Sequence, residues 1–152
     1  MARYSASGSQ NLPASLTPIT ALTIAAQSTA HRNIFYDIVV ANMGAPADLV
    51  TLHTIQRITA VGTAGSSVTP ALLDIADRAS QSAVGENHSG EPTYTANTEL
   101  LEIPLNHRAT FRWVAAPGGE IITPATNNSG IGAKAYHASA TTEWRVGCMW
   151  EE

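Results

Sequence analysis

Charged side chains and cysteine are both scarce in this chain of 152 residues. Only 13% of the residues are Asp, Glu, Lys or Arg, against about 25% in an average soluble domain. Cys148 is the only cysteine, which excludes an intrachain disulfide and leaves the fold to packing. A surface with so few charges is poorly protected against association. The composition therefore favours an assembled protein over a monomer.

Basic charge and long apolar runs are also missing. The net charge is -4, Lys134 is the only lysine, and the arginines are scattered along the chain. Binding to phosphate backbones needs a basic stripe, so nucleic acid is not a predicted partner. No apolar run approaches the roughly 18 residues that would span a membrane. The N-terminus also lacks the charged and apolar regions of a signal peptide, so neither a membrane partner nor secretion is predicted.

The last ten residues carry a clear alternation of apolar and polar side chains. Trp144, Val146, Cys148 and Trp150 fall on one face of an extended chain, and polar or small residues fall on the other. A period of two is typical of a half-buried β-strand. The pattern therefore predicts a strand over residues 143–152, with two tryptophans in the core and Cys148 as a buried structural thiol.

Similar patterns predict the other elements. The phase of the pattern changes within residues 49–61, which indicates a bulge, with a helix as the alternative. Pro70 cannot donate to a sheet, which places its segment at an edge or in irregular chain. Residues 75–90 are predicted to hold a helical turn and then a long exposed loop. Strands are predicted over residues 19–26, 34–41, 49–61, 68–74, 93–105 and 108–116, with 131–139 leading into the last strand.

Turn residues separate these segments. Turns are predicted at residues 42–46, 117–119 and 127–130, which are rich in Asn, Gly and Pro. About eight short antiparallel strands with no sustained helical pattern predict an all-β, single-domain, jelly-roll-like β-sandwich over residues 19–152.

The first 18 residues are polar and small, and we interpret residues 1–18 as an extended N-terminal arm. One alternative is a frayed end. The other is an arm that docks on a partner protein or a neighbouring subunit. The partner-binding residues proposed for this arm are Arg3, Tyr4, Leu12 and Leu16.

Several polar residues could carry chemistry, but none forms a recognisable motif. The histidines have no short ligand spacing, so a three-histidine metal site would need the fold to assemble it. The acidic residues between 74 and 91 could act as an acid–base pair, although capping of turns is the simpler interpretation. No catalytic residue, metal or cofactor is predicted. The histidines are His31, His53, His88, His107 and His137, and the acidic residues are Asp74, Asp77, Glu86 and Glu91.

Three segments together resemble small β-rich virion proteins of tailed bacteriophages. They are Gly-Ser-Ser-Val-Thr-Pro-Ala-Leu-Leu-Asp at residues 65–74 with Asp77, Ala-Pro-Gly-Gly-Glu at 116–120, and the terminal Trp-Glu-Glu. The resemblance covers roughly residues 30–152. It implies a jelly-roll-like decoration, or cement, protein on the capsid exterior, made in the host cytoplasm. Such a protein is a homotrimer, bridges major capsid protein subunits and has no catalytic residues.

Two other functions remain open. One is a carbohydrate-binding β-sandwich module of a phage receptor-binding or fibre protein, in which exposed Trp113 and Tyr94 would stack on sugars. The other is a small enzyme of cupin type, which would need a histidine-rich metal site.

Overall fold

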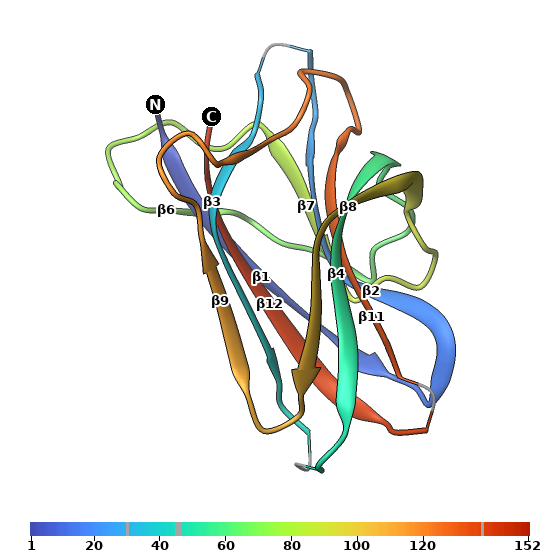
Figure 1. Cartoon of the computed structure of the whole chain (residues 1–152). Helices are drawn as coiled ribbons and strands as arrows, with labels where there is room; N and C mark the ends of the chain where they lie inside the picture. Colours follow the sequence, from blue (N-terminus) through green and yellow to red (C-terminus); the bar gives the residue numbers. More distant parts are fainter. Residues whose placement is uncertain (30, 45–46, 138) are drawn as a thin grey trace.

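Two antiparallel β-sheets face each other and enclose an apolar core (Figure 1). The computed structural model describes residues 1–29, 31–44, 47–137 and 139–152. Among these residues no helix is long and apolar enough to cross a membrane. The all-β sandwich predicted from the period-two patterns is confirmed.

The first sheet is built around the two ends of the chain. The N-terminal strand β1 pairs with the C-terminal strand β12 over ten residues, from Arg3 opposite Glu151 to Leu12 opposite Thr142. β3 follows on the other side of β12, and both β9 and β10 pair with β3, at different positions along it. β6 pairs with β1 at the opposite edge. The strands are β1 (Arg3–Leu12), β3 (Ile34–Asn42), β6 (Ala71–Leu72), β9 (Thr110–Val114), β10 (Ile121–Ile122) and β12 (Thr142–Glu151).

The second sheet has the order β5-β7-β2-β11-β4-β8. Its long central strands are continuous except for bulges, which shift the register between β2 and β11 and between β4 and β8. The bulge predicted in residues 49–61 is therefore confirmed, and the helical alternative is wrong. The strands are β2 (Ser15–Ala26), β4 (Val50–Ala60), β5 (Ser66–Ser67), β7 (Ser82–Glu86), β8 (Thr93–Asn106) and β11 (Gly130–His137).

The order of the long strands is that of a jelly roll. β1, β12, β3 and β9 lie in this order in the first sheet, and β2, β11, β4 and β8 in the second. Along the chain, successive long strands lie in opposite sheets with one exception. β4 and β8 follow each other among the long strands and pair within the second sheet. Two Greek keys wound in this way form the double-sheet jelly roll.

The segment between β4 and β8 adds short strands to both sheets. Residues 61–92 contribute β7 beside β2, β5 beside β7 and β6 beside β1, so they extend both sheets at the same edge of the sandwich. Pro70 lies between β5 and β6, as its missing donor predicts. The long exposed loop predicted within residues 75–90 is wrong at β7, where Ser82, Val84 and Gly85 are buried against β2.

The core is aromatic on the side of the first sheet. Trp144 and Trp150 are fully buried, and Trp150 packs between Tyr4 and Phe35 with ring centroids 5.7 and 6.1 Å away. Aliphatic side chains of the second sheet, such as Leu22 and Ile24, complete it. The prediction that the two C-terminal tryptophans belong to the core is confirmed.

The N-terminal arm predicted for residues 1–18 is wrong, because β1 is an inner strand of the first sheet. Ala2, Tyr4, Ala6 and Leu12 are buried, while Ser5, Ser7 and Ser9 alternate with them on the outer face. Serine, alanine and glycine hide this alternation, since none of them is strongly apolar or strongly polar. The sandwich therefore begins at Arg3 rather than at residue 19.

The side chain of Glu152 ties the end of β12 to the segment that leads into β7. Its carboxylate accepts hydrogen bonds from Ser80 Oγ at 2.5 Å, Ser82 Oγ at 2.8 Å, the Gln81 backbone N–H at 2.9 Å and Trp150 Nε1 at 3.2 Å. Burial acts to raise the pKa of Glu152, but these donors outweigh burial and lower it.

Turns occur where Gly and Asn favour them. Gly118 adopts φ +81° in the turn at residues 117–119, and Asn128 adopts φ +63° in the turn at 127–130. Of the turn predicted at residues 42–46, Ala45 and Pro46 lie outside the described residues. Residues 131–137 belong to β11 itself, and Ala138 lies outside the described residues.

Candidate docking surface

The four residues proposed for partner binding do not form one surface. Tyr4 and Leu12 are fully buried inner-face residues of β1, so they serve the core and are unavailable to a partner. Tyr4 also donates its hydroxyl proton to the Arg78 carbonyl at 3.0 Å. Arg3 and Leu16 are exposed, but Arg3 lies on the first sheet and Leu16 at the start of β2 in the second.

The outer face of the second sheet is covered over much of its area by the chain itself. Residues 61–64 and 88–99 lie against it. A Cβ on Gly85 would lie 2.6 Å from Ala64 Cβ, and a Cβ on Gly132 would lie 2.7 Å from Tyr94 Oη. These glycines are required where the covering segment touches the sheet.

Polar contacts fix this covering segment. Tyr94 Oη lies 2.7 Å from Thr20 Oγ1, which in turn donates to Glu91. Lys134 Nζ lies 4.4 Å from the centre of the Tyr94 ring, a cation–π contact. Burial is the largest cause that raises the pKa of Tyr94, and the nearby Glu91 carboxylate adds to it, whereas the hydrogen bond between Tyr94 and Thr20 opposes it.

The outer face of the first sheet, in contrast, is open. Small and polar side chains alternate there with the buried ones, and the register places them in cross-strand rows. Ser7, Gly147 and Val39 form one such row from β1 across β12 to β3, and the Ser5 row ends at Asp37.

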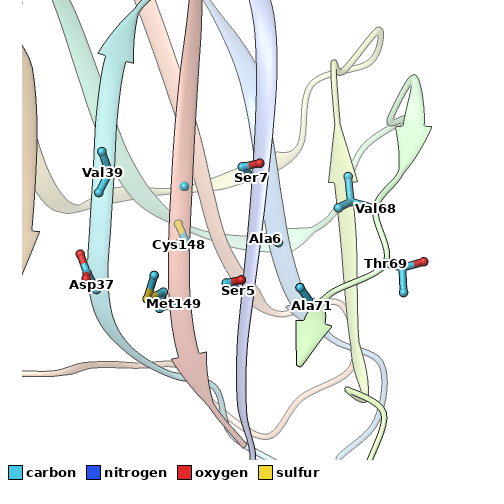
Figure 2. A pocket seen from close by; sticks show the side chains of 11 residues that line it. Ser5, Ala6, Ser7, Asp37, Val39, Val68, Thr69, Ala71, Cys148 and Met149 are labelled. Atoms are coloured by element: carbon cyan, nitrogen blue, oxygen red, sulfur yellow. The ribbon is translucent and has the colours of Figure 1, made fainter. Parts of the chain in front are cut away.

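A groove of about 360 Å³ lies on this open face (Figure 2). Its floor is formed by side chains of β1, β12 and β3, and the segment at residues 68–71 forms a wall beside β1. The groove is mainly apolar and shallow, and its volume is at the low end of the range for ligand pockets, about 300–1,000 Å³. It is lined by Ser5, Ala6, Ser7, Asp37, Val39, Val68, Thr69, Ala71, Gly147, Cys148 and Met149.

The only charged group in the groove is neutralised within the chain. Arg112 donates from Nε to both carboxylate oxygens of Asp37, at 3.0 and 3.2 Å, and also from one terminal nitrogen. The Asp37 side chain is 6% exposed, and that of Arg112 is 61% exposed. The hydrogen bonds to Asp37 raise the pKa of Arg112. Because the Arg112 guanidinium pairs with the Asp37 carboxylate, the two side chains together add no net charge to the groove floor.

Cys148 belongs to the hydrophobic core directly beneath the groove. Burial, with a smaller effect of Asp37, raises the pKa of its thiol to about 12. A thiol with that pKa is protonated at neutral pH and is a poor nucleophile. The prediction of a buried structural cysteine is confirmed.

No family model, curated protein or solved structure matches this chain. Its candidate site therefore depends on geometry alone.

The structure gathers three of the histidines at one end of the sandwich. The rings of His107 and His137 are 5.6 Å apart, and His53 packs on Trp144 with ring centroids 4.9 Å apart. No group of three or more potential ligands among the described residues could hold a metal ion. His31 and His88 are buried elsewhere, and His88 Nε2 lies 3.2 Å from Thr23 Oγ1.

The carboxylates considered for acid–base chemistry all contact backbone groups. Asp74 accepts from the Ala76 N–H within a turn, and Asp77 accepts from the N–H of Arg3. Glu86 accepts from the Ser9 N–H and Glu91 from the Thr20 N–H. The simpler interpretation, that such residues fix turns and strand ends, agrees with these contacts.

The aromatic residues considered for sugar stacking are partly covered. Trp113 packs against the core from β9, and Tyr94 is held between Thr20 and Lys134. The groove on the open face contains no aromatic ring. Sequence patterns did not reveal this groove, because its residues come from four strands and a loop, and most are small.

Proposed function

We propose that this chain is a non-enzymatic structural protein of a virion, and that it binds the outside of the capsid and bridges major capsid protein subunits. The observation that carries the proposal is the difference between the two outer faces of the sandwich. The chain covers much of one face with its own residues 61–64 and 88–99 and leaves the other open, with a shallow groove of small side chains.

Small side chains suit contact between two protein surfaces. Ser5, Ser7 and Gly147 let a partner backbone approach the sheet closely, and Val39 and Met149 offer apolar contact. Interfaces between separately folded proteins combine such an apolar centre with a polar rim. Arg112 and Arg145, which are exposed on the same face, would supply polar contacts at this rim.

The resemblance to small virion proteins adds the identity of the partner. In this proposal several copies, assembled as a homotrimer, attach to sites that only the expanded shell presents. Binding to one state of the shell stabilises that state by mass action. Several weak contacts made at once give firm attachment through effective concentration.

The test uses undecorated bacteriophage heads assembled from a major capsid protein. The wild-type protein should sediment with the heads in a gradient, and Ser7→Arg should remove most of the bound fraction because it fills the groove. Ser66→Arg is the matched control, because it places the same side chain on exposed β5 in the other sheet. The absence of wild-type protein from the head fraction would refute the proposal. Equal binding by Ser7→Arg would refute the groove as its site.

A further inference from the structure

Part of the outer face of the second sheet is neither covered nor polar. Along β4, the outward side chains of Ile58, Gln56 and Thr54 are 2–3% exposed, beneath the chain's own covering segment. Leu52, the next outward residue, is half-buried, and Val50 is 55% exposed. The covering segment therefore ends at Thr54, whereas the apolar character of the face continues.

Neighbouring strands extend this apolar surface. Leu52 lies opposite Tyr136 of β11 on one side and opposite Pro104 of β8 on the other. Leu16, which is 69% exposed, lies in the bulged stretch of β2 that faces the end of β11. We call this set the apolar row: Leu16, Val50, Leu52, Pro104 and Tyr136.

The pattern of the strands indicates that something buries the apolar row. A sheet face in contact with water normally carries polar side chains at alternate positions, as the outer face of β1 does. The apolar row instead places a leucine, a tyrosine and a proline side by side across three strands. Contiguous exposed apolar surface of this kind marks an interaction site.

The charges beside the apolar row indicate what the partner is. The next cross-strand row reads Lys134, Thr54 and Glu102 from β11 to β8. Lys134 and Glu102 stand two strand spacings apart, roughly 10 Å, and neither has an ion-pair partner among the described residues. A cation on one flank and an anion on the other allow the Lys134 flank of one copy to face the Glu102 flank of the next copy, a head-to-tail contact that can close into a ring of identical subunits.

We propose that copies of this chain associate through the apolar row, with Lys134 of one copy facing Glu102 of the next. This inference deepens the proposed function, because it assigns self-association to the second sheet and leaves the groove on the first sheet for the capsid. Apolar interfaces are typical of permanent homo-oligomers, and smaller, more polar ones of contacts between proteins that also exist apart. The apolar row, which has no charged member, fits the first kind of interface.

The experiment measures the mass of the protein by light scattering at micromolar concentration. The wild-type protein should have a mass of more than one chain. Val50→Glu should be monomeric, because it places an unpaired carboxylate in the contact, and we expect its dissociation constant to rise at least about 100-fold. Val114→Glu is the matched control and should keep the wild-type mass, because Val114 is equally exposed, at 58%, but lies on the first sheet.

A charge exchange tests the pairing of the flanks. Glu102→Lys alone should weaken association about tenfold, since it opposes two cations, and Lys134→Glu alone should weaken it similarly. The double variant should recover most of the wild-type association. Failure of the double variant to recover would overturn the proposed pairing of Lys134 with Glu102.

A wild-type monomer, or a Val50→Glu variant with the wild-type mass, would overturn self-association through the apolar row. Tryptophan fluorescence and thermal unfolding verify that each variant is folded. Head binding separates the two proposals. A monomer that binds heads refutes this inference alone, whereas an assembled protein that does not bind heads refutes the proposed function alone.

Discussion

Acid should destabilise this protein through His53, which lies in the core at the end of the sandwich. Its side chain is 1% exposed and packs on Trp144, and neither ring nitrogen has a hydrogen-bond partner among the described residues. Burial, with a smaller contribution from the nearby charge of His107, lowers the pKa of His53 from 6.5 to about 4. Folding therefore requires the neutral imidazole.

The sign and size of the effect follow from this difference. In the unfolded chain His53 takes up a proton near pH 6.5, and in the folded protein only near pH 4. The stability that the neutral ring supports is thus present above pH 6.5 and is lost as the pH falls towards 4. Between pH 7 and pH 5, linkage gives a loss of about 2 kcal/mol in the free energy of unfolding.

Replacing His53 by leucine isolates this contribution. His53→Leu keeps a side chain of similar size against Trp144 and removes the titrating group. Urea unfolding followed by tryptophan fluorescence, at pH 7 and pH 5, gives the free energy of unfolding of both proteins. The variant should lose about 2 kcal/mol less than the wild type between these two pH values. All other titratable groups are the same in both proteins, so their contributions cancel in this difference.

Parallel pH dependence of the two proteins would refute the reasoning. It would mean that His53 is protonated equally easily in the folded and unfolded states, and hence that the ring reaches water. The same measurement at pH 8 and pH 7 serves as a control, because the two proteins should then differ by a constant amount.

Three further predictions concern stability. Glu152→Gln should lower the free energy of unfolding by about 1–2 kcal/mol at pH 7, because it weakens the four hydrogen bonds to that carboxylate. The pKa of Glu152 is lowered in the folded protein, so the difference between wild type and variant should shrink as the pH falls below 4.5, as measured by urea unfolding. Deleting residues 1–12 should abolish folding, as seen in circular dichroism, because the deletion removes an inner strand; a folded deletion variant would restore the arm model. Gly130→Ala should lower the free energy of unfolding by about 3 kcal/mol or more, because a Cβ at this position would lie 1.9 Å from the Ile24 carbonyl oxygen. Gly118→Ala should lower it by only about 1–2 kcal/mol, the cost of its positive φ, because a Cβ there would have nothing within 4 Å.

The sequence predicted the strands whose inner faces are large and apolar. Residues 34–41 and 143–152 alternate strongly, and both are strands of the first sheet. β1 was missed because its inner face includes Ala6 and Gly8. A Cβ on Gly8 would lie 2.7 Å from the Ala21 carbonyl oxygen. The two sheets approach so closely there that a large apolar side chain does not fit, and the sequence therefore lacks an apolar residue at this inner position.

Neither candidate surface could be found from local patterns. The groove needs the register of β1, β12 and β3, and a shift of one residue in any of these strands would turn its floor into core. Of the apolar row, the sequence patterns single out only Leu16, and they place it in a predicted N-terminal arm. Its other members lie in separate predicted strands, and only the pairing of β11, β4 and β8 shows that they are neighbours.

The pairing of β1 with β12 also bears on how the protein is made. The first sheet joins strands that are separated by almost the whole sequence. Such pairings slow folding, because the chain loses the entropy of closing a long loop before the contacts between the strands can stabilise it. On the ribosome β1 lacks its ten-residue pairing with β12 until β12 emerges, and only the short strand β6 can pair with it earlier. The first sheet is therefore incomplete during most of synthesis, and its apolar inner face is left exposed. We therefore expect a strong dependence of the soluble yield on temperature and on chaperones, even though the finished sandwich is well packed.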